Sequence, residues 1–282
     1  SVAYSPQCDR IACAHSLSFS KDGENGFCEN FYEFSEPTSS FETNYETSAS
    51  ERKSNIKLAS QKLDGVIILP NQVLSFNEIV GSRTFKNGYR TATIIESGKF
   101  TQGLGGGVCQ VSTTLYVAAL LSGFEIAEYR AHSLPVSYVP LSLDAAVSEK
   151  IDLKIKNPYP TPVLIKTEAD GKILRISVYC ENPSPNLKVK LRSKMLKELE
   201  ATMTDKDDTD GVLLETETEK IIIPAHSGYL SESYMDYIDQ SGAVVSTIKI
   251  RTDRYLPQNG ERIIRSESET NMLKLNTVSV KV

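Results

Sequence analysis

The apolar positions in the middle of the chain predict a helix that begins directly after a glycine run. From Val111 to Ser122 the apolar residues share one face, so we predict an amphipathic helix that ends at Gly123. These residues are Val111, Leu115, Ala118 and Ala119. The run from Gly103 to Gly107 comes just before the helix, and glycines allow a tight turn and a close approach to a ligand.

The same kind of pattern predicts an earlier helix and two strands. Ser50 is a candidate N-cap for a helix that ends near Gly65. Val66–Leu69 and Val73–Phe76 follow as short strands. The apolar stripe of the helix comprises Ile56, Leu58, Ala59 and Leu63.

Strand patterns dominate the rest of the chain. A strand is predicted at Phe124–Ala131, directly after the central helix. Val163–Thr167 and Ile173–Tyr179 lie on either side of Asp170-Gly171, a turn signal that predicts a β-hairpin. Beyond a Pro- and Asn-rich boundary at residues 181–186 we predict further strands. They are Leu187–Leu191, Ile221–Ile223, Tyr229–Ile238, Val244–Arg251 and Leu275–Val280.

Together these elements predict an α+β fold in three parts. Residues 1–49 are polar and are expected to form an irregular N-terminal segment. Residues 50–182 are expected to pack the helix that follows the glycines against an antiparallel sheet. Residues 187–282 are expected to form a small all-β module, with a solvated loop at Asp205–Asp210.

Composition narrows the class of protein. The 282 residues are 40% hydrophobic and 24% charged, which is typical of a globular protein. The net charge of −5 argues against binding nucleic acid or anionic lipid through a broad basic surface. No apolar run approaches the roughly 18 residues of a membrane span. Because the chain starts at Ser1 without Met, we expect that an N-terminal signal or anchor has been removed.

The five cysteines divide into one candidate nucleophile and four others. Cys8, Cys13, Cys28 and Cys180 can pair in three ways in an oxidising compartment, which would leave Cys109 free. Cys8 and Cys13 with His15 match no strong zinc spacing, so no metal site is predicted.

Cys109 is the strongest candidate for chemistry. A thiol at a helix N-terminus faces unpaired N–H groups and the positive end of the helix dipole, which favour the thiolate. A thiolate in such a position suits nucleophilic acyl transfer, with backbone N–H groups of Cys109 and the neighbouring glycines as an oxyanion hole.

His132 is the predicted base among the three histidines. A helix of about 20 Å followed by a returning strand, Phe124–Ala131, of about 25 Å would bring His132 back to the thiol. Asp144, flanked by apolar residues, is the predicted orienting acid. The predicted substrate contacts are Gly106, Gly107, Gln110, Ser112, Arg130, Ser133 and Tyr138.

Structural interpretations of the same residues stay open at this point. Cys109 can instead be a small buried apolar residue, and His132 can be a histidine of the core or of a loop. Asp144 can be a turn residue or a helix cap. The glycine run fails as a P-loop because no Lys-Ser/Thr follows, and Val108 occupies the place of the third glycine of a dinucleotide-binding motif.

Several sequence blocks together resemble the VanW domain. They are Phe76–Gly81, Asn87–Tyr89, Gly105–Tyr116 and His132–Pro140, within a similarity that runs from about Ala59 to Glu181. The part after Pro185 resembles, more loosely, the G5-like β segments that often follow such domains.

The resemblance implies a function in the cell wall. Some VanW-domain proteins of clostridial type are implicated as L,D-transpeptidases of peptidoglycan, with the cysteine of the block equivalent to Gly105–Gln110 as nucleophile. The Ser-His-Gly-Cys signature of the usual L,D-transpeptidases is absent here, so only shared chemistry is implied. The alternatives are a non-catalytic peptidoglycan-binding protein and a cysteine peptidase that hydrolyses the same acyl-enzyme.

Partners and location follow from the same resemblance. The expected partners are peptidoglycan stem peptides, with no cofactor and no nucleic acid. The expected location is extracellular, at the cell envelope of a Gram-positive bacterium, with the membrane contacted only through an anchor outside this sequence.

Overall fold

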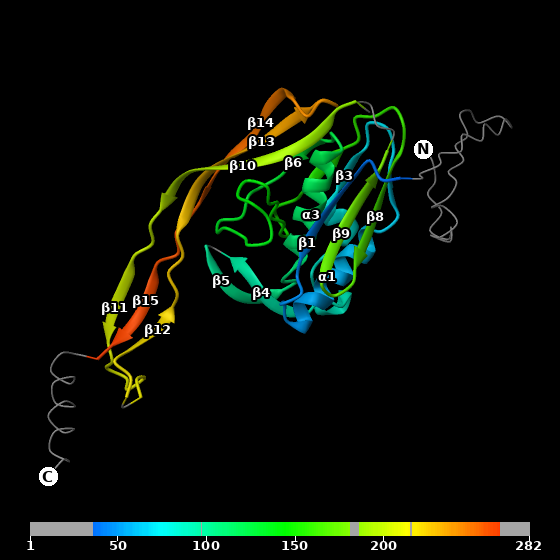
Figure 1. Cartoon of the computed structure of the whole chain (residues 1–282). Coiled ribbons are helices and arrows are strands. Elements are labelled where there is room, and N and C mark those ends of the chain that lie inside the picture. The colour runs from blue at the N-terminus through cyan, green and yellow to red at the C-terminus, as the bar shows by residue number, and fades with distance from the viewer. Residues whose placement is uncertain (1–35, 97, 181–185, 215, 266–282) are drawn as a thin grey trace, which may run out of the picture.

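The structure is a computed structural model that describes residues 36–96, 98–180, 186–214 and 216–265. Its body is built on a four-stranded antiparallel sheet of order β1-β9-β8-β2, and helices α1 and α3 pack on this sheet (Figure 1). The strands are β1 Ser39–Asn44, β2 Val66–Ile68, β8 Val163–Ala169 and β9 Ile173–Tyr179, and the helices are α1 Ser50–Leu63 and α3 Val108–Leu121.

Smaller elements complete the body around the two helices. A three-stranded sheet has the order β3-β7-β6, and β4 and β5 form a separate hairpin. The strands are β3 Val73–Ser75, β4 Thr91–Glu96, β5 Lys99–Leu104, β6 Glu125–Glu128 and β7 Lys154–Lys156. The short helices are α2 Phe76–Val80 and the 3-10 helix η2 Phe85–Asn87.

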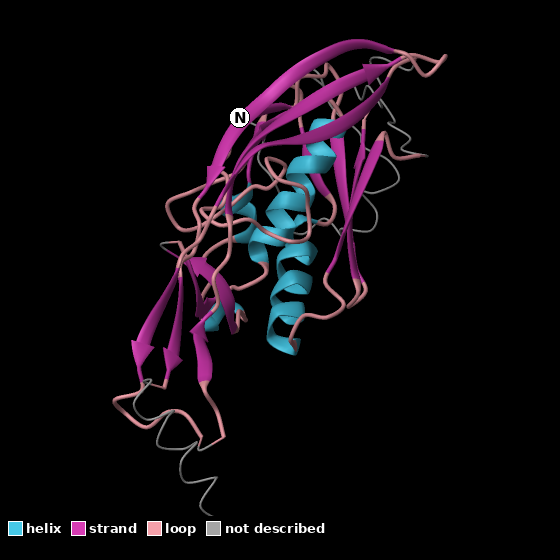
Figure 2. Ribbon diagram, turned by 60° about the vertical axis from the view of Figure 1, so that its left-hand side comes forward, coloured by secondary structure: helices cyan, strands magenta, loops and turns pink. Residues whose placement is uncertain are grey.

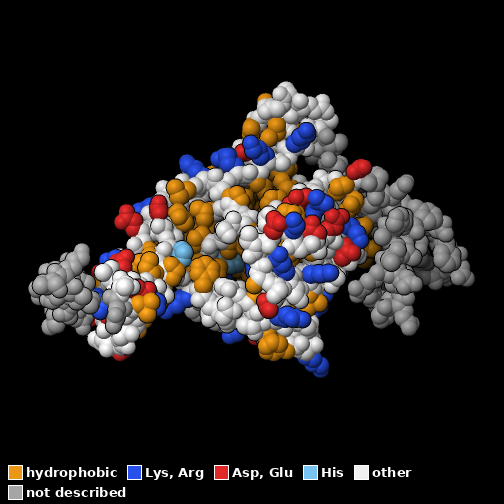
Figure 3. Space-filling model, turned by 60° about the horizontal axis from the view of Figure 1, so that its bottom comes forward, with side chains coloured by type: hydrophobic (Ala, Val, Ile, Leu, Met, Phe, Trp, Pro, Cys, Tyr) orange, Lys and Arg blue, Asp and Glu red, His pale blue; other side chains and the backbone are white. Residues whose placement is uncertain are grey.

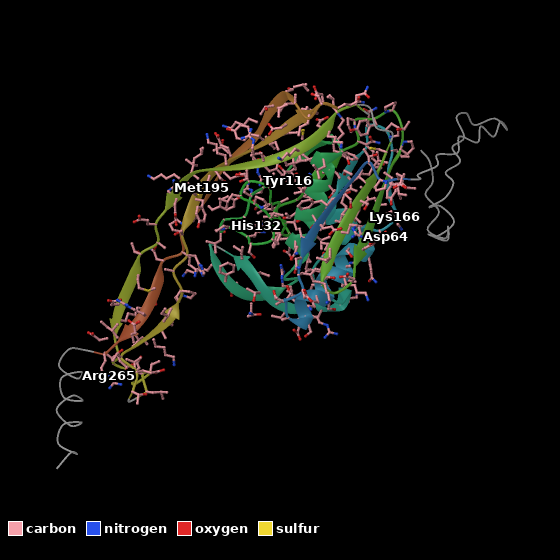
Figure 4. The ribbon with its side chains drawn as sticks, viewed as in Figure 1. Asp64, Tyr116, His132, Lys166, Met195 and Arg265 are labelled. Carbon is pink, nitrogen blue, oxygen red and sulfur yellow. The ribbon has the colours of Figure 1, made fainter. Side chains whose placement is uncertain are left out.

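The second region consists of two three-stranded sheets. The sheet β10-β13-β14 lies along the body, and the sheet β11-β15-β12 projects away from it as an arm (Figures 1 and 4). β10 carries a bulge between Met195 and Lys197, close to the point where the arm leaves the body. The strands are β10 Lys188–Leu199, β11 Met203–Asp207, β12 Glu219–Ile223, β13 Gly228–Ile238, β14 Val244–Tyr255 and β15 Gly260–Ile264.

Helix α3 is buried on all sides, and the prediction that it is amphipathic was wrong. Every residue from Gln110 to Leu120 is buried. The body sheet covers one side of the helix, and the sheet β10-β13-β14 lies on another (Figure 2). Met235 of β13 joins the main core, and residues of β10 and β14 such as Leu191 and Ile250 pack against it. The two regions therefore share one hydrophobic core.

The α+β class and the all-β second region agree with the prediction, but several boundaries differ. Residues 39–44, predicted to be irregular, form edge strand β1 of the main sheet. The N-cap of α1 is Ala49 rather than Ser50, whose hydroxyl bonds Glu51 instead. Phe76, predicted to end a strand, opens α2 because the Ser75 hydroxyl caps that helix by accepting from the Glu78 N–H.

The second region also differs from its prediction in detail. Asp205 lies in β11 rather than in a loop, and its carboxylate pairs with Arg262 of β15 at 2.6 Å. Neither β11 nor β15 was predicted, because both are short and carry charged residues in place of a clear apolar alternation. The predicted strand Leu275–Val280 and residues 181–185 of the predicted boundary lie outside the described residues.

Cys180 has a free thiol within the part of the chain that the structure describes. Its sulfur lies 3.4 Å from the Thr38 hydroxyl. The other cysteines of the predicted pairings, Cys8, Cys13 and Cys28, and the weak metal candidate with His15 lie outside the described residues.

Candidate functional site

Cys109 lies in the first turn of α3, half-buried at the wall of a cavity. The N-cap of the helix is Gly107, with φ of 104°, and no side chain caps the helix there. The Cys109 Sγ atom is 3.3 Å from the Val147 carbonyl oxygen and 3.5 Å from the Val147 N–H nitrogen. The thiol can thus donate to Val147, and a thiolate can accept from it.

The glycine run is required by close packing around this turn. A Cβ atom at Gly106 would lie 2.6 Å from the Thr93 carbonyl oxygen of β4. Buried Asn55 of α1 holds the run in place, because its Nδ2 donates to the Gly106 carbonyl oxygen at 2.9 Å. The same amide bonds the backbone of Arg90 through both its oxygen and its nitrogen.

His132 and Asp144 lie together beside the thiol. The Asp144 Oδ2 atom is 2.6 Å from His132 Nδ1 and 2.7 Å from the His132 backbone nitrogen. The side chain of His132 also faces Cys109: it lowers the pKa of the thiol through hydrogen bonding and charge, and both residues line the same cavity. Since Nδ1 is engaged by Asp144, Nε2 is the ring nitrogen that faces the sulfur. Figure 4 marks His132 on the side of the body that faces the second region.

The route of the chain to His132 differs from the prediction. The strand expected at Phe124–Ala131 is only Glu125–Glu128, and irregular chain carries His132 the rest of the way. His132 is positioned by two hydrogen bonds to the Asp144 carboxylate, one from its backbone N–H and one at Nδ1, rather than by a long strand.

Asp144 is held from the second region, in which the sequence predicted no site residue. Arg251 Nη2 of β14 lies 3.1 Å from Asp144 Oδ1 and 2.6 Å from the Asp144 carbonyl oxygen. The Tyr255 hydroxyl donates to the same Oδ1 atom. The guanidinium carbon of Arg251 lies 5.1 Å and 4.9 Å from the ring centres of Tyr116 and Tyr129 in the body.

The electrostatics of the three groups favour an ion pair of thiolate and imidazolium. Burial lowers the pKa of His132, but Asp144 and Cys109 outweigh it and raise that pKa to about 10. Burial raises the pKa of the Cys109 thiol, but the hydrogen bond and charge of His132, Val147 and Arg83 together bring it below its ordinary value. Burial works against ionisation of Asp144 as well, yet His132 and Arg251 keep the pKa of its carboxyl low.

These shifts predict the pH dependence of alkylation. Cys109 should react with iodoacetamide at pH values below the ordinary thiol pKa of about 8.5, because the thiolate persists there. In His132→Asn the onset should move up toward that ordinary value. Cys180 is an internal control, since burial raises the pKa of its thiol, and peptide mass spectrometry distinguishes the two sites. Equal profiles for Cys109 and Cys180 would contradict the ion pair.

The cavity at Cys109 has a volume of about 760 Å³. Of the predicted substrate contacts, Gly106, Gly107, Gln110 and Tyr138 line it. Gln110 is nevertheless occupied within the protein: its Oε1 accepts from Arg52, and its Nε2 donates to Thr43 and Asn44. Tyr138 hydrogen-bonds Thr113, and burial raises the pKa of its phenol.

Three predicted substrate contacts do not reach the cavity. Ser112 is fully buried, and its hydroxyl donates to the Ala145 carbonyl oxygen at 2.6 Å, so it supports the chain next to Asp144. Arg130 has an exposed side chain outside the cavity lining. Ser133 is also outside the lining, and its carbonyl oxygen accepts from Leu256 N–H of the second region.

Other lining residues were not predicted from the sequence. Arg52 of α1 and Arg83, which follows α2, bring positive charge into the cavity. Phe100 of β5 and His226 of the second region also line it, with ring centres 5.9 Å apart. Figure 3 shows apolar side chains gathered on one face of the molecule around a histidine at the surface. No local motif marks these residues, because they come from distant elements.

The comparisons with known proteins find similarity in the body. Residues 51–179 match the model of the family described as VanW like protein, so this part of the chain is similar to VanW-like proteins. The uncharacterized protein YoaR of Bacillus subtilis is 38% identical over 138 residues, which cover 49% of this chain and 46% of that protein.

The vancomycin B-type resistance protein VanW of Enterococcus faecalis is 33% identical over 109 residues, which cover 36% of this chain and 40% of that protein. The chain thus spans less than half the length of either relative. Among the described residues, no helix has the length and apolar content needed to cross a membrane.

Two solved G5 domain structures also match part of the chain. The G5 domain of HP0197 has a TM-score of 0.17 and 18% identity, covering 28% of this chain and 96% of its own. The G5 domain of IgA1 protease has a TM-score of 0.19 and 12% identity, covering 28% and 92%. At these TM-scores nothing about the function of the second region follows.

Proposed function

We propose that this protein is a cysteine acyltransferase of the cell envelope, an L,D-transpeptidase that forms 3–3 cross-links between peptidoglycan stem peptides. The observation that carries the proposal is that Cys109 and His132 line the same cavity, with His132 Nδ1 held by buried Asp144. This is the arrangement of nucleophile, base and orienting acid used for acyl transfer. Similarity to a resistance-related VanW protein supports a location at the envelope.

The first half-reaction forms a thioester. The Cys109 thiolate attacks the carbonyl carbon of the third residue of a donor tetrapeptide, and the C–N bond to the terminal D-Ala breaks. Protonated His132 gives its proton to the departing amine. Asp144 keeps the imidazolium oriented and stabilises its charge.

The second half-reaction transfers the acyl group to an amine. Neutral His132 now takes a proton from the acceptor amine of a neighbouring stem, which attacks the thioester and releases Cys109. The proposed steps need no cofactor. The acyl-transfer chemistry is assigned to residues 50–182, completed by β14.

Backbone N–H groups at the start of α3 are assigned to the oxyanion. The N–H groups of Val108 and Gln110 already donate to the carbonyl oxygens of Gly105 and Gly107 at 3.0 Å. The Gly105 N–H donates to the Arg90 carbonyl oxygen at 3.1 Å, so the proposed donors are the N–H groups of Gly106, Gly107 and Cys109, at the positive end of the helix dipole.

The decisive experiment incubates the full chain with disaccharide tetrapeptides and follows both protein and products. We expect a mass increase on Cys109 equal to the disaccharide tripeptide minus water, with release of D-Ala, together with 3–3 linked dimers. Cys109→Ala should give neither. Dimers formed equally by Cys109→Ala would overturn the proposal.

The products also separate transfer from its alternatives. Free tripeptide without dimers would identify hydrolysis of the same thioester, and the protein would then be a cysteine peptidase. Peptide binding without any adduct on Cys109 would identify a non-catalytic wall-binding protein.

A further inference from the structure

Two arginines line the cavity beside the thiol, and apart from the effect of Arg83 on the pKa of Cys109 neither has a role in the steps described so far. Arg52 projects from α1 and Arg83 from the segment after α2, and both line the cavity of Cys109. Both are only partly exposed. A partly buried guanidinium loses hydration, which costs free energy. Two such groups without a carboxylate partner therefore need a physical reason.

Each guanidinium is anchored by a neutral amide and not by a carboxylate. Arg52 Nη2 donates to Gln110 Oε1 at 2.7 Å, and Arg83 Nη2 donates to Asn77 Oδ1 at 2.6 Å. Within the described ranges neither arginine forms an ion pair, whereas Arg175, Arg192, Arg251 and Arg262 all do. The amides fix the two side chains but leave their charge and several N–H donors available.

The glycine run makes room for these two side chains. A Cβ atom at Gly105 would lie 2.7 Å from Arg83 Cγ, and one at Gly107 would lie 3.0 Å from Arg52 Cγ. The aliphatic parts of the two arginine side chains therefore pack at the two ends of the segment Gly105–Gly107. Burial lowers the pKa of both guanidiniums, and the negative charge of Cys109 opposes that shift in each case.

The rest of the cavity wall does not neutralise this charge. Among the described lining residues the one carboxylate is Glu149, which is exposed. Glu149 and Asp152 act on Arg83 through their charge, but no carboxylate of the described residues acts on Arg52, so the cavity presents two fixed cations and one lining acid in contact with solvent. Guanidinium groups bind carboxylates through paired hydrogen bonds, which adds direction to the attraction.

We propose that Arg52 and Arg83 form a carboxylate-binding subsite that recognises the free C-terminal carboxylate of the acyl donor. The subsite would select peptides in which one residue with a free carboxylate follows the scissile amide bond. The subsite would give the proposed acyl transfer its substrate specificity. The inference rests on the proposed function, but binding of the peptide can be measured without the reaction.

The test uses the full chain with Cys109→Ser, so that the ligand stays intact. Isothermal titration calorimetry compares a stem tetrapeptide ending in D-Ala with the same peptide ending in D-alaninamide. We expect the acid to bind roughly tenfold or more tightly than the amide, as for hydrogen bonds to charged groups. Adding Arg52→Gln or Arg83→Gln should weaken binding of the acid and leave binding of the amide nearly unchanged.

Arg90→Gln is the matched control, because Arg90 is exposed and outside the cavity lining. It should preserve the preference for the acid. Thermal unfolding of each variant verifies the fold, and the comparison of acid with amide in the parent protein needs no arginine variant at all.

Three results would overturn the subsite: equal affinity for acid and amide in the parent, an undiminished preference in both arginine variants, or no binding of the acid at millimolar concentration. Failure of the proposed function looks different. In that case the wild-type protein would bind the acid selectively yet never carry an acyl group on Cys109.

Discussion

Asp144→Asn is expected to lower the rate of Cys109 acylation by about four orders of magnitude, the loss typical for the orienting acid of a triad. The amide removes the charge that stabilises the His132 imidazolium. Its NH₂ group can also face Nδ1 and favour the wrong tautomer. The acylation rate is measured by quenched mass spectrometry with the tetrapeptide donor.

A second readout separates this role from general support of the fold. The pKa of His132, about 10 in the parent, should fall in Asp144→Asn, as followed by the imidazole NMR signals. Asp236→Asn is the matched control, since Asp236 is also buried and paired with an arginine but lies in the second region outside the cavity. Acylation by Asp144→Asn within tenfold of the parent rate would contradict the assignment.

Arg251→Met is expected to destabilise the protein by about 3–5 kcal/mol, the usual cost of removing one partner from a buried ion pair. The Arg251 side chain is only 2% exposed, and it links Asp144 to the faces of Tyr116 and Tyr129. Urea unfolding measures the loss, and the acylation rate should fall with it because Asp144 loses a positioning partner.

Arg192→Met supplies the comparison from the same sheet. Arg192 pairs with Asp236 at 3.0 Å, but its side chain is 45% exposed, so its loss should cost no more than about 1 kcal/mol. Arg251→Lys keeps the charge and should recover part of the acylation rate. Equal costs for the two methionine variants would show that the buried bridge does not stabilise the fold.

The sequence predicted those parts of the molecule that local signals define. Alternation around Asp170-Gly171 predicted the β8–β9 hairpin, and the glycine run predicted the start of a helix near Cys109. His132 was found because the chain has few histidines, although the long strand expected to deliver it is short. Residue type and spacing therefore selected a cysteine and a histidine that line the same cavity, and their roles as nucleophile and base stay predictions.

The missing parts depend on contacts between distant elements. The polarity of residues 39–44 gave no strand signal, because β1 is specified by its pairing with β9. Arg251 lies 107 positions from Asp144, and no pattern within β14 marks it as a partner of that acid. Arg52 and Arg83 likewise look like ordinary surface cations until α1 and the segment after α2 are folded around the glycine run.

Strand β14 holds Asp144 through Arg251 and Tyr255, which limits how the body and the second region can be exchanged between proteins. A chimera that joined the body to a foreign β module would keep Cys109 and His132 but leave Asp144 without its partners, unless the graft supplied arginine and tyrosine at the places of Arg251 and Tyr255.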